Sequence, residues 1–188
     1  MFIQTEDTPN PNTIKFIPGE DVSGKNIHLN RTEKSTISPL ADSLFKLEKV
    51  KSVFLGSDFI SVTKSDDASW DILKTEVLTT IMDHYVAGKP IINEKKEEEN
   101  SSDSDDKEDP IITEIKELIE TRVRPAVAQD GGDIIFHGFE DGVVKLEMHG
   151  ACSGCPSSSL TLKSGIENML QYYIPEVKSV EAIENISE

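Results

Sequence analysis

Hydrophobic residues in the first half of the chain alternate with polar ones over short stretches, and elsewhere they recur at the helical period. The alternating stretches predict strands at residues 13–17, 50–55 and 59–63. The helical period predicts a helix over residues 39–47, which Ser38 caps and Pro39 begins. A longer helix is predicted over residues 69–87. Trp70 lies on its apolar stripe, so we expect a core residue there, with ligand stacking as the alternative.

The second half shows the same two periods in a different order. It predicts strands at residues 134–139, 143–149 and 177–183, and helices from about residue 111 and over residues 156–173. Pro125 has no N–H group, so we expect the first helix to kink or end there. Alternation directs Val144, Leu146 and Met148 to the core. The expected fold class is α+β, with two small domains in which helices pack on a small β-sheet.

One segment between these halves carries no hydrophobic residue. Residues 93–109 read NEKKEEENSSDSDDKED, with nine acids and three lysines. Nothing in this segment can be buried to offset the entropy of ordering it, so we expect a disordered acidic linker. The expected organisation is a first domain at residues 1–92, the linker at 93–109, and a second domain at 110–188.

Acidic residues outnumber basic ones along the chain. The formal net charge is −16, from 35 acids and 19 lysines and arginines. This charge repels phosphate backbones and anionic lipids, so we expect neither nucleic acid nor membrane as a partner. No apolar run approaches the roughly 18 residues that span a bilayer, and the first twelve residues look like neither a secretion signal nor a transit peptide. We therefore expect a bacterial cytoplasmic protein, or a mitochondrial matrix protein if the chain is a mature form.

The stretch GACSGCPSSS at residues 150–159 holds the two cysteines of the chain, Cys152 and Cys155. Pro156 is suited to the first position of a helix, which makes Cys155 the expected N-cap. A helix N-terminus carries partial positive charge and free N–H groups, and both lower the pKa of a nearby cysteine. The surrounding glycines and serines add little bulk, so we expect an open loop that another molecule can reach.

Four kinds of site are compatible with these cysteines, and the first is a pair of buried structural thiols. The second is a zinc site, which needs two further ligands. The candidates for these are His28, His84, His137 and His149. His137 and His149 lie on predicted strands, where a solvated face residue is the simpler interpretation. The third is a thioredoxin-like dithiol, in which the proline lies between the cysteines and the pair follows a strand of a parallel βαβ unit. Here Pro156 follows the second cysteine, and an antiparallel hairpin precedes the pair.

The fourth kind of site is an iron–sulfur cluster shared between two chains. A [4Fe–4S] or [2Fe–2S] cluster takes four thiolates, and each chain supplies two. The cluster would then form part of a symmetric homodimer interface. Such a cluster is exposed, and thiolates of a client protein can displace its ligands one at a time. This arrangement suits the transfer of a cluster better than it suits electron transfer.

Longer motifs around the cysteines resemble a known family. Residues 123–134, VRPAVAQDGGDI, and 150–170, GACSGCPSSSLTLKSGIENML, resemble the NifU C-terminal (Nfu) domain. The first domain resembles the Nfu N-terminal domain. The matching stretches are FIQTEDTPNPNTIKFIPG at residues 2–19, SPLADSLF at 38–45, and residues 70–90. Together the motifs cover nearly the whole chain apart from the linker.

The resemblance implies a carrier or scaffold for a [4Fe–4S] cluster, and not an enzyme. Cys152 and Cys155 fall on the cluster-ligand positions of the family, whose N-terminal domain takes part in partner recognition and supplies no ligand. Members of the family accept a cluster from assembly proteins and deliver it to client apoproteins. Lipoyl synthase, aconitase-type enzymes and respiratory subunits are typical clients. The long acidic linker departs from relatives with shorter connections.

Four charged residues near these motifs have two interpretations each. Asp130 and Asp133 are either metal carboxylates or, more simply, part of a helix stop and turn in which a neighbouring glycine supplies a positive φ. Arg122 and Arg124 either balance the charge of an anionic cluster or are solvated.

Overall fold

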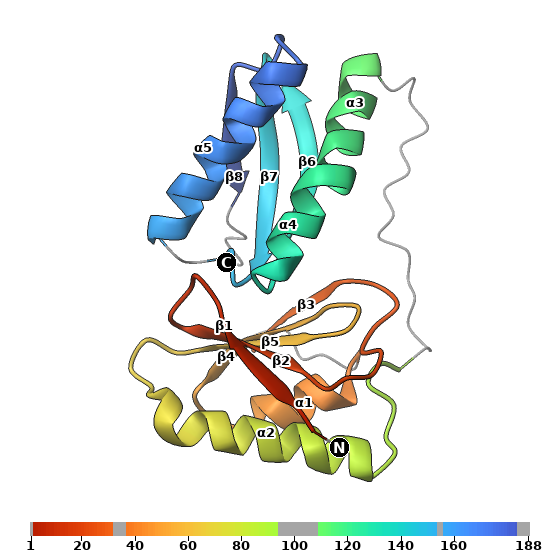
Figure 1. Ribbon diagram of the computed structural model, residues 1–188, viewed down its shortest axis with the longest axis vertical. Coiled ribbons are helices and arrows are strands. Elements are labelled where there is room, and N and C mark those ends of the chain that lie inside the picture. Colours follow the sequence, from red (N-terminus) through yellow and green to blue (C-terminus); the bar gives the residue numbers. More distant parts are fainter. Residues whose placement is uncertain (1, 32–36, 94–108, 154–155, 184–188) are drawn as a thin grey trace. The chain divides into compact units, whose positions relative to one another are not determined.

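The fold was analysed in a computed structural model that describes residues 2–31, 37–93, 109–153 and 156–183 (Figure 1). The chain divides into two compact units, residues 1–99 and 100–188, which are described separately below. Both units are α+β, as the hydrophobic pattern predicts. Most of the predicted acidic linker, residues 94–108, lies outside the described residues. Within the described residues, no helix is both long and apolar enough to cross a bilayer.

Unit 1 is an antiparallel five-stranded sheet with two helices on one face (Figure 1). Its strands are β1 (Gln4–Asp7), β2 (Thr13–Ile17), β3 (Ile27–Asn30), β4 (Val50–Leu55) and β5 (Ile60–Lys64), in the spatial order β1-β2-β5-β4-β3. The helices are α1 (Pro39–Phe45) and α2 (Trp70–Val86). Side chains from the sheet and both helices form one core, in which Phe16, Leu40, Val62 and Ile81 are fully buried.

Local sequence signals position both helices of this unit. Ser38 caps α1, since its hydroxyl accepts from the N–H of Ala41 at 3.1 Å, and Pro39 occupies the first turn. The same hydroxyl donates to the carbonyl of Ile91 at 2.6 Å, which ties the helix start to the segment after α2. Trp70 packs partly buried against the core, and its indole N–H donates to the carbonyl of Pro11 at 3.1 Å. The core role predicted for Trp70 is confirmed.

Two strands of unit 1 were not predicted, namely β1 and β3. Both are short strands of four residues at the edges of the sheet. β1 reads QTED and is mostly exposed, so it carries almost no hydrophobic alternation. Edge strands are held by backbone pairing with one neighbour, which sequence periodicity does not report.

Unit 2 combines an antiparallel and a parallel strand pairing in one sheet. Its strands are β6 (Gly132–Glu140), β7 (Val143–Gly150) and β8 (Ser179–Ile183), in that spatial order. Its helical segments are α3 (Pro110–Leu118), the π-helical turn η2 (Ile119–Val123), α4 (Arg124–Gln129) and α5 (Pro156–Tyr173). β6 pairs with β7 antiparallel, and β7 pairs with β8 parallel through the α5 crossover. The inward positions predicted for Val144, Leu146 and Met148 are confirmed.

The π-helical turn explains how the helix passes Pro125. We expected a kink or an early end, yet the helix continues to Gln129. The N–H of Arg124 donates to the carbonyl of Ile119, five residues earlier, which widens the turn just before the proline. Because Pro125 has no N–H and its ring clashes with an ordinary turn, a widened turn accommodates it without ending the helix.

The two faces of α2 provide a stability test with an internal control. Ile81 is completely buried, and Ile72 on the same helix is 73% exposed. We expect Ile81→Ala to lower the unfolding free energy of unit 1 by about 2–5 kcal/mol, since it leaves a cavity in the core. Ile72→Ala should change it by less than about 0.5 kcal/mol. Urea unfolding followed by the fluorescence of Trp70 measures both variants, and equal losses would contradict the assigned core.

Candidate functional site

Cys152 lies in the loop that connects β7 to α5. Gly150 ends β7 with a φ of 62°, a conformation that glycine adopts without strain. The N–H of Ala151 then donates to the carbonyl of Gly131 at 3.1 Å, and the N–H of Ser153 donates to that of Gly150 at 3.1 Å. The first bond fastens the start of the loop to the turn between α4 and β6, and the second closes a turn within the loop. The helix predicted after the loop is present and begins at Pro156.

The thiol of Cys152 is buried, which contradicts the open loop expected from the sequence. Cys152 is 6% exposed and belongs to the core of unit 2. A Cβ atom added to Gly132 would lie only 2.4 Å from Cys152 Sγ, so the thiol fills the space that the glycine leaves. Burial, followed by the nearby Asp130 and Asp133 carboxylates, raises the pKa of Cys152 to about 12. Cys152 is therefore a neutral thiol at neutral pH.

The prediction of a lowered pKa was wrong for Cys152 for a physical reason. The prediction considered the N-terminus of α5 and took no account of the side chains that Cys152 packs against. Core side chains and two carboxylates disfavour a thiolate at Cys152. Cys155, the predicted N-cap, lies outside the described residues.

Asp133 and Arg124 form the principal ion pair beside this loop. Arg124 Nε donates to Asp133 Oδ1 and its Nη2 to Asp133 Oδ2, both at 2.8 Å, and the Asp133 side chain is 2% exposed. Arg124 also donates to Glu120 at 2.7 Å from the preceding turn. Its hydrogen bonds to Asp133 are the main cause that raises the pKa of Arg124. The bidentate pair joins α4 to β6 and satisfies a buried carboxylate.

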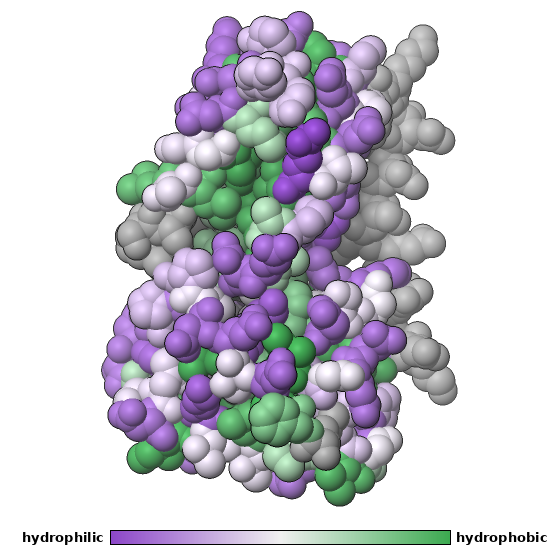
Figure 2. All heavy atoms as spheres, viewed as in Figure 1, coloured by the Kyte–Doolittle hydropathy of each residue, from purple (hydrophilic) through white to green (hydrophobic). Residues whose placement is uncertain are grey.

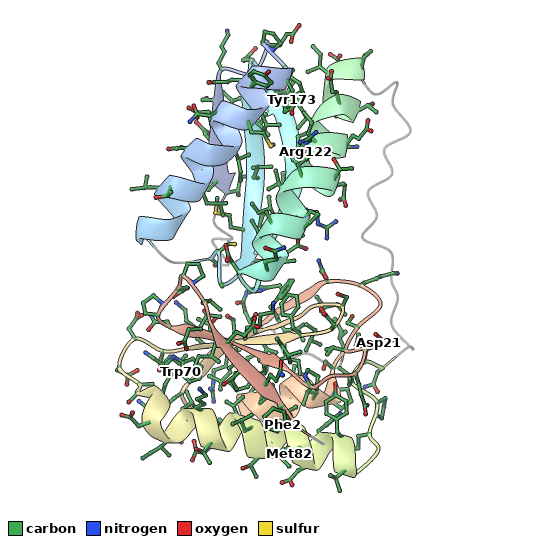
Figure 3. All side chains as sticks on the ribbon, in the orientation of Figure 1. Phe2, Asp21, Trp70, Met82, Arg122 and Tyr173 are labelled. Atoms are coloured by element: carbon green, nitrogen blue, oxygen red, sulfur yellow. The ribbon has the colours of Figure 1, made fainter. Side chains whose placement is uncertain are left out.

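The other two charged residues near the motif, Asp130 and Arg122, have simpler roles. Asp130 is an exposed residue at the end of α4, and Gly131 follows with a φ of 79°. The helix stop and turn predicted there is confirmed. Arg122 lies with its guanidinium carbon 5.2 Å from the ring centre of Tyr173, a cation–π contact between η2 and α5 (Figure 3).

A glutamate bridges two histidines on β6 and β7. Glu147 is 8% exposed, and its two carboxylate oxygens face Nε2 of His137 and Nε2 of His149, the second at 3.1 Å. Burial lowers the pKa of His149, against the opposing effects of Glu147 and Asp133. The interpretation of His149 as a solvated residue is therefore wrong, because its side chain is only 12% exposed. Glu147 and His149 share one face of β7 by alternation, but the triad was missed because only the pairing of β6 with β7 brings His137 to them.

The zinc interpretation finds no preformed site in the described part of the chain. No group of three or more histidine, cysteine, aspartate or glutamate side chains there is placed to hold a metal ion. In unit 1, His28 contacts the side chain of Asn30, and His84 contacts the carbonyl of Pro90, each at 3.1 Å.

One objection to the dithiol interpretation does not hold. The antiparallel hairpin β6–β7 does precede the cysteines, but β7, α5 and β8 also form a parallel βαβ unit. The loop therefore follows a strand of a parallel crossover, as it does in a thioredoxin-like site. Two features still distinguish this loop from a thioredoxin-like site: Pro156 follows both cysteines, and the pKa of Cys152 is raised.

The buried ion pair predicts that removing Arg124 costs much more stability than removing its exposed partner Glu120. Arg124→Met leaves Asp133 buried without its counterion, so we expect unit 2 to lose about 3–5 kcal/mol of unfolding free energy. Glu120→Gln removes a partner that is 60% exposed and should cost at most about 1 kcal/mol. Hydrogen exchange of the β6 and β7 amides measures both losses. Equal effects of the two variants would contradict the assigned pairing.

The environment of Cys152 predicts slow and pH-dependent alkylation. In the reduced, metal-free chain at pH 8, iodoacetamide should modify Cys152 about a hundredfold more slowly than in the urea-unfolded chain. Both burial and the raised pKa act in this direction, and the rate should keep rising with pH up to about 12. Mass spectrometry of the labelled peptides gives the rate. A rate equal to that of the unfolded chain would contradict the buried position.

Comparison with known proteins covers both units. The family described as "Scaffold protein Nfu/NifU N terminal" matches residues 3–88, and "NifU-like domain" matches residues 115–181. A solution NMR structure of a NifU-like protein from Saccharomyces cerevisiae is 26% identical with a TM-score of 0.46, over 50% of this chain and 87% of that one.

Longer similarities extend over almost the whole chain. The protein "NFU1 iron-sulfur cluster scaffold homolog, mitochondrial" of Drosophila sechellia is 51% identical over 97% of this chain, which spans 65% of that protein. The protein of the same name in Homo sapiens is 49% identical, over 97% of this chain and 72% of the relative. By both domain matches and these identities, the chain belongs to the Nfu family of iron–sulfur cluster scaffold proteins.

Proposed function

We propose that this protein holds a [4Fe–4S] cluster between two chains and transfers it to client apoproteins, with Cys152 and Cys155 as ligands. The observation that carries the proposal is the position of the only two cysteines of the chain. Both lie in one Cys-x-x-Cys loop of the unit that matches the NifU-like family. The cluster is cargo in this proposal, and the chain performs no substrate turnover.

The number of thiols supports sharing between chains. A cluster with four thiolate ligands needs two more than one chain offers, and a second copy supplies them in a symmetric homodimer. Two carboxylates of unit 2 are engaged elsewhere, Glu147 with His137 and His149, and Asp133 with Arg124. A [2Fe–2S] cluster satisfies the same count of ligands and is the alternative cargo.

The buried thiol adds a step to loading. Cys152 must leave the space beside Gly132 and lose its proton before its sulfur can bind iron. Because deprotonation accompanies binding, uptake of the cluster should become more favourable as pH rises. The same preference for the buried, protonated state favours release, since it offers Cys152 a stable position once the cluster has gone.

The partners follow from the carrier role. Assembly proteins would donate the cluster, and apoproteins such as lipoyl synthase and aconitase-type enzymes would receive it. Relatives named as mitochondrial favour the mitochondrial matrix over the bacterial cytosol as the place where this happens.

A dithiol oxidoreductase is the second candidate, because the cysteine loop follows a strand of a parallel βαβ unit. It predicts a reversible disulfide between Cys152 and Cys155 and disulfide reduction without iron. The raised pKa of Cys152 is unfavourable for this chemistry, which needs a thiolate. A zinc-binding module is the third and predicts tightly bound zinc in the protein as isolated.

Anaerobic reconstitution with iron and sulfide tests the proposal. We expect a brown protein with four iron and four sulfide ions per two chains, which sediments as a dimer. Cys152→Ser and Cys155→Ser should each abolish the cluster, because either variant leaves a homodimer with two thiolates in place of the four that the cluster needs. Iron, sulfide and zinc analysis combined with sedimentation velocity gives the stoichiometry.

Two matched variants serve as controls. His137→Asn and His149→Asn alter the triad on β6 and β7 and leave both thiols in place, so each should retain the cluster. A colourless monomer after reconstitution, or a variant of either histidine without cluster, would contradict the ligand set. Stoichiometric zinc in the protein as isolated would favour the binding module instead.

A further inference from the structure

Helix α2 is hydrophobic on the face that it turns to solvent as well as on its buried face. Ile72 is 73% exposed, Met82 40% and Val86 81%, although the opposite side of the helix fills the core of unit 1. Figure 3 labels Met82 on this helix, and Figure 2 shows hydrophobic surface at the same end of unit 1. An isolated exposed leucine or valine needs no explanation, but a repeated pattern along one helix does.

These residues form a continuous stripe. With two threonines between Ile72 and Met82, these residues make a set of five. Successive members are 3 or 4 positions apart, which places all five on one side of the helix. The members are Ile72, Thr75, Thr79, Met82 and Val86, named here the α2 stripe. The hydroxyl of Thr79 donates to the carbonyl of Thr75 at 2.9 Å within the helix. The polar atom of Thr79 is thus already bonded, and the stripe runs about 21 Å without a charge.

Acidic side chains border the stripe on both sides. Asp71 lies on the side of Met82, and Glu76 and Asp83 lie on the side of Ile72, each of them exposed. The one lysine of α2, the partly buried Lys74, lies outside the stripe, and the helix carries no arginine. An uncharged ridge between acidic borders is complementary to a helix whose own apolar ridge is bordered by basic residues.

Charge argues against an occupant from this protein. A second copy would bring the same acidic borders into contact with themselves. Residues 93–109 and 110–188 are both net acidic, so the rest of the chain offers no basic partner either. Anionic membranes are repelled for the same reason. The electrostatic pattern therefore favours a basic segment of another protein.

We infer that the α2 stripe is a docking surface for a basic amphipathic helix of a partner protein. The partner helix spans about four turns, carries apolar residues three and four positions apart, and borders them with lysine or arginine. The inference goes beyond cluster carriage and does not depend on it, since the stripe lies in the unit without cysteines.

The test titrates the full-length, cluster-free protein with three synthetic 18-residue peptides, followed by NMR of its backbone amides. One peptide has leucines at helical spacing bordered by lysines, the second has the same composition in scrambled order, and the third has glutamate for every lysine. We expect the first to shift amides of α2, and the other two to bind at least about tenfold more weakly. Raising the salt concentration should weaken the binding of the first peptide, because its charges are exposed.

Variants of the chain locate the binding. The double variant Ile72→Ser and Val86→Ser should weaken the first peptide about tenfold without lowering the thermal unfolding temperature of unit 1, since both side chains are exposed. Tyr172→Ser changes a side chain that is 81% exposed in unit 2 and should leave binding unchanged.

Several results would overturn the inference. They are equal binding of the scrambled peptide, binding that shifts no α2 amide, and unchanged binding by the double variant. Sedimentation of the wild type as a dimer that the double variant abolishes would identify a second copy as the occupant. Binding of neutral phosphatidylcholine vesicles that the double variant abolishes would identify a lipid surface instead.

Discussion

The bidentate pairing of Arg124 with the buried carboxylate of Asp133 is the interaction on which unit 2 depends. Asp133 lies at the start of β6 beside the loop of Cys152, and Arg124 begins the helix that ends at that strand. A single buried carboxylate so close to a metal-ligand candidate would otherwise be free to bind a cation or to shift the loop. Because the guanidinium of Arg124 binds both of its oxygens, the Asp133 carboxylate instead fixes α4 against the sheet.

The widened turn that accommodates Pro125 also bears on this pairing. The turn must carry the helix past a residue without an N–H group, and it must also leave Arg124 directed at β6. The same segment then ends in the glycine pair, where Gly131 provides the positive φ and Gly132 provides room for a sulfur atom. Helix, turn and strand thus converge on one cysteine, and a change in any of them would reach the thiol.

Much of the fold could be predicted from the sequence, because its longer elements carry strong periods and clear caps. Ser38 and Pro39 predicted the first helix of unit 1, and the period of the buried hydrophobic residues predicted α2. Alternation along β7 predicted which of its residues share the core face. β1 and β3 could not be predicted, since each is only four residues long, β1 is mostly exposed, and β3 places only Ile27 and Leu29 against the core. The functional site was harder to predict than the fold. The spacing of the cysteines indicated metal chemistry, but the burial of Cys152 depends on Gly132, twenty residues earlier, and only the folded sheet brings the two together.

In the proposed carrier role, the position of Cys152 also bears on the survival of the protein between rounds of loading. Sulfenic acid formation and disulfide exchange both start from a thiolate that oxidants can reach. A thiol that is 6% exposed, with a pKa raised to about 12, offers neither accessibility nor charge. The core of unit 2 therefore disfavours oxidation of this cysteine, and in the proposed role the step that exposes it to iron also exposes it to peroxide and oxygen.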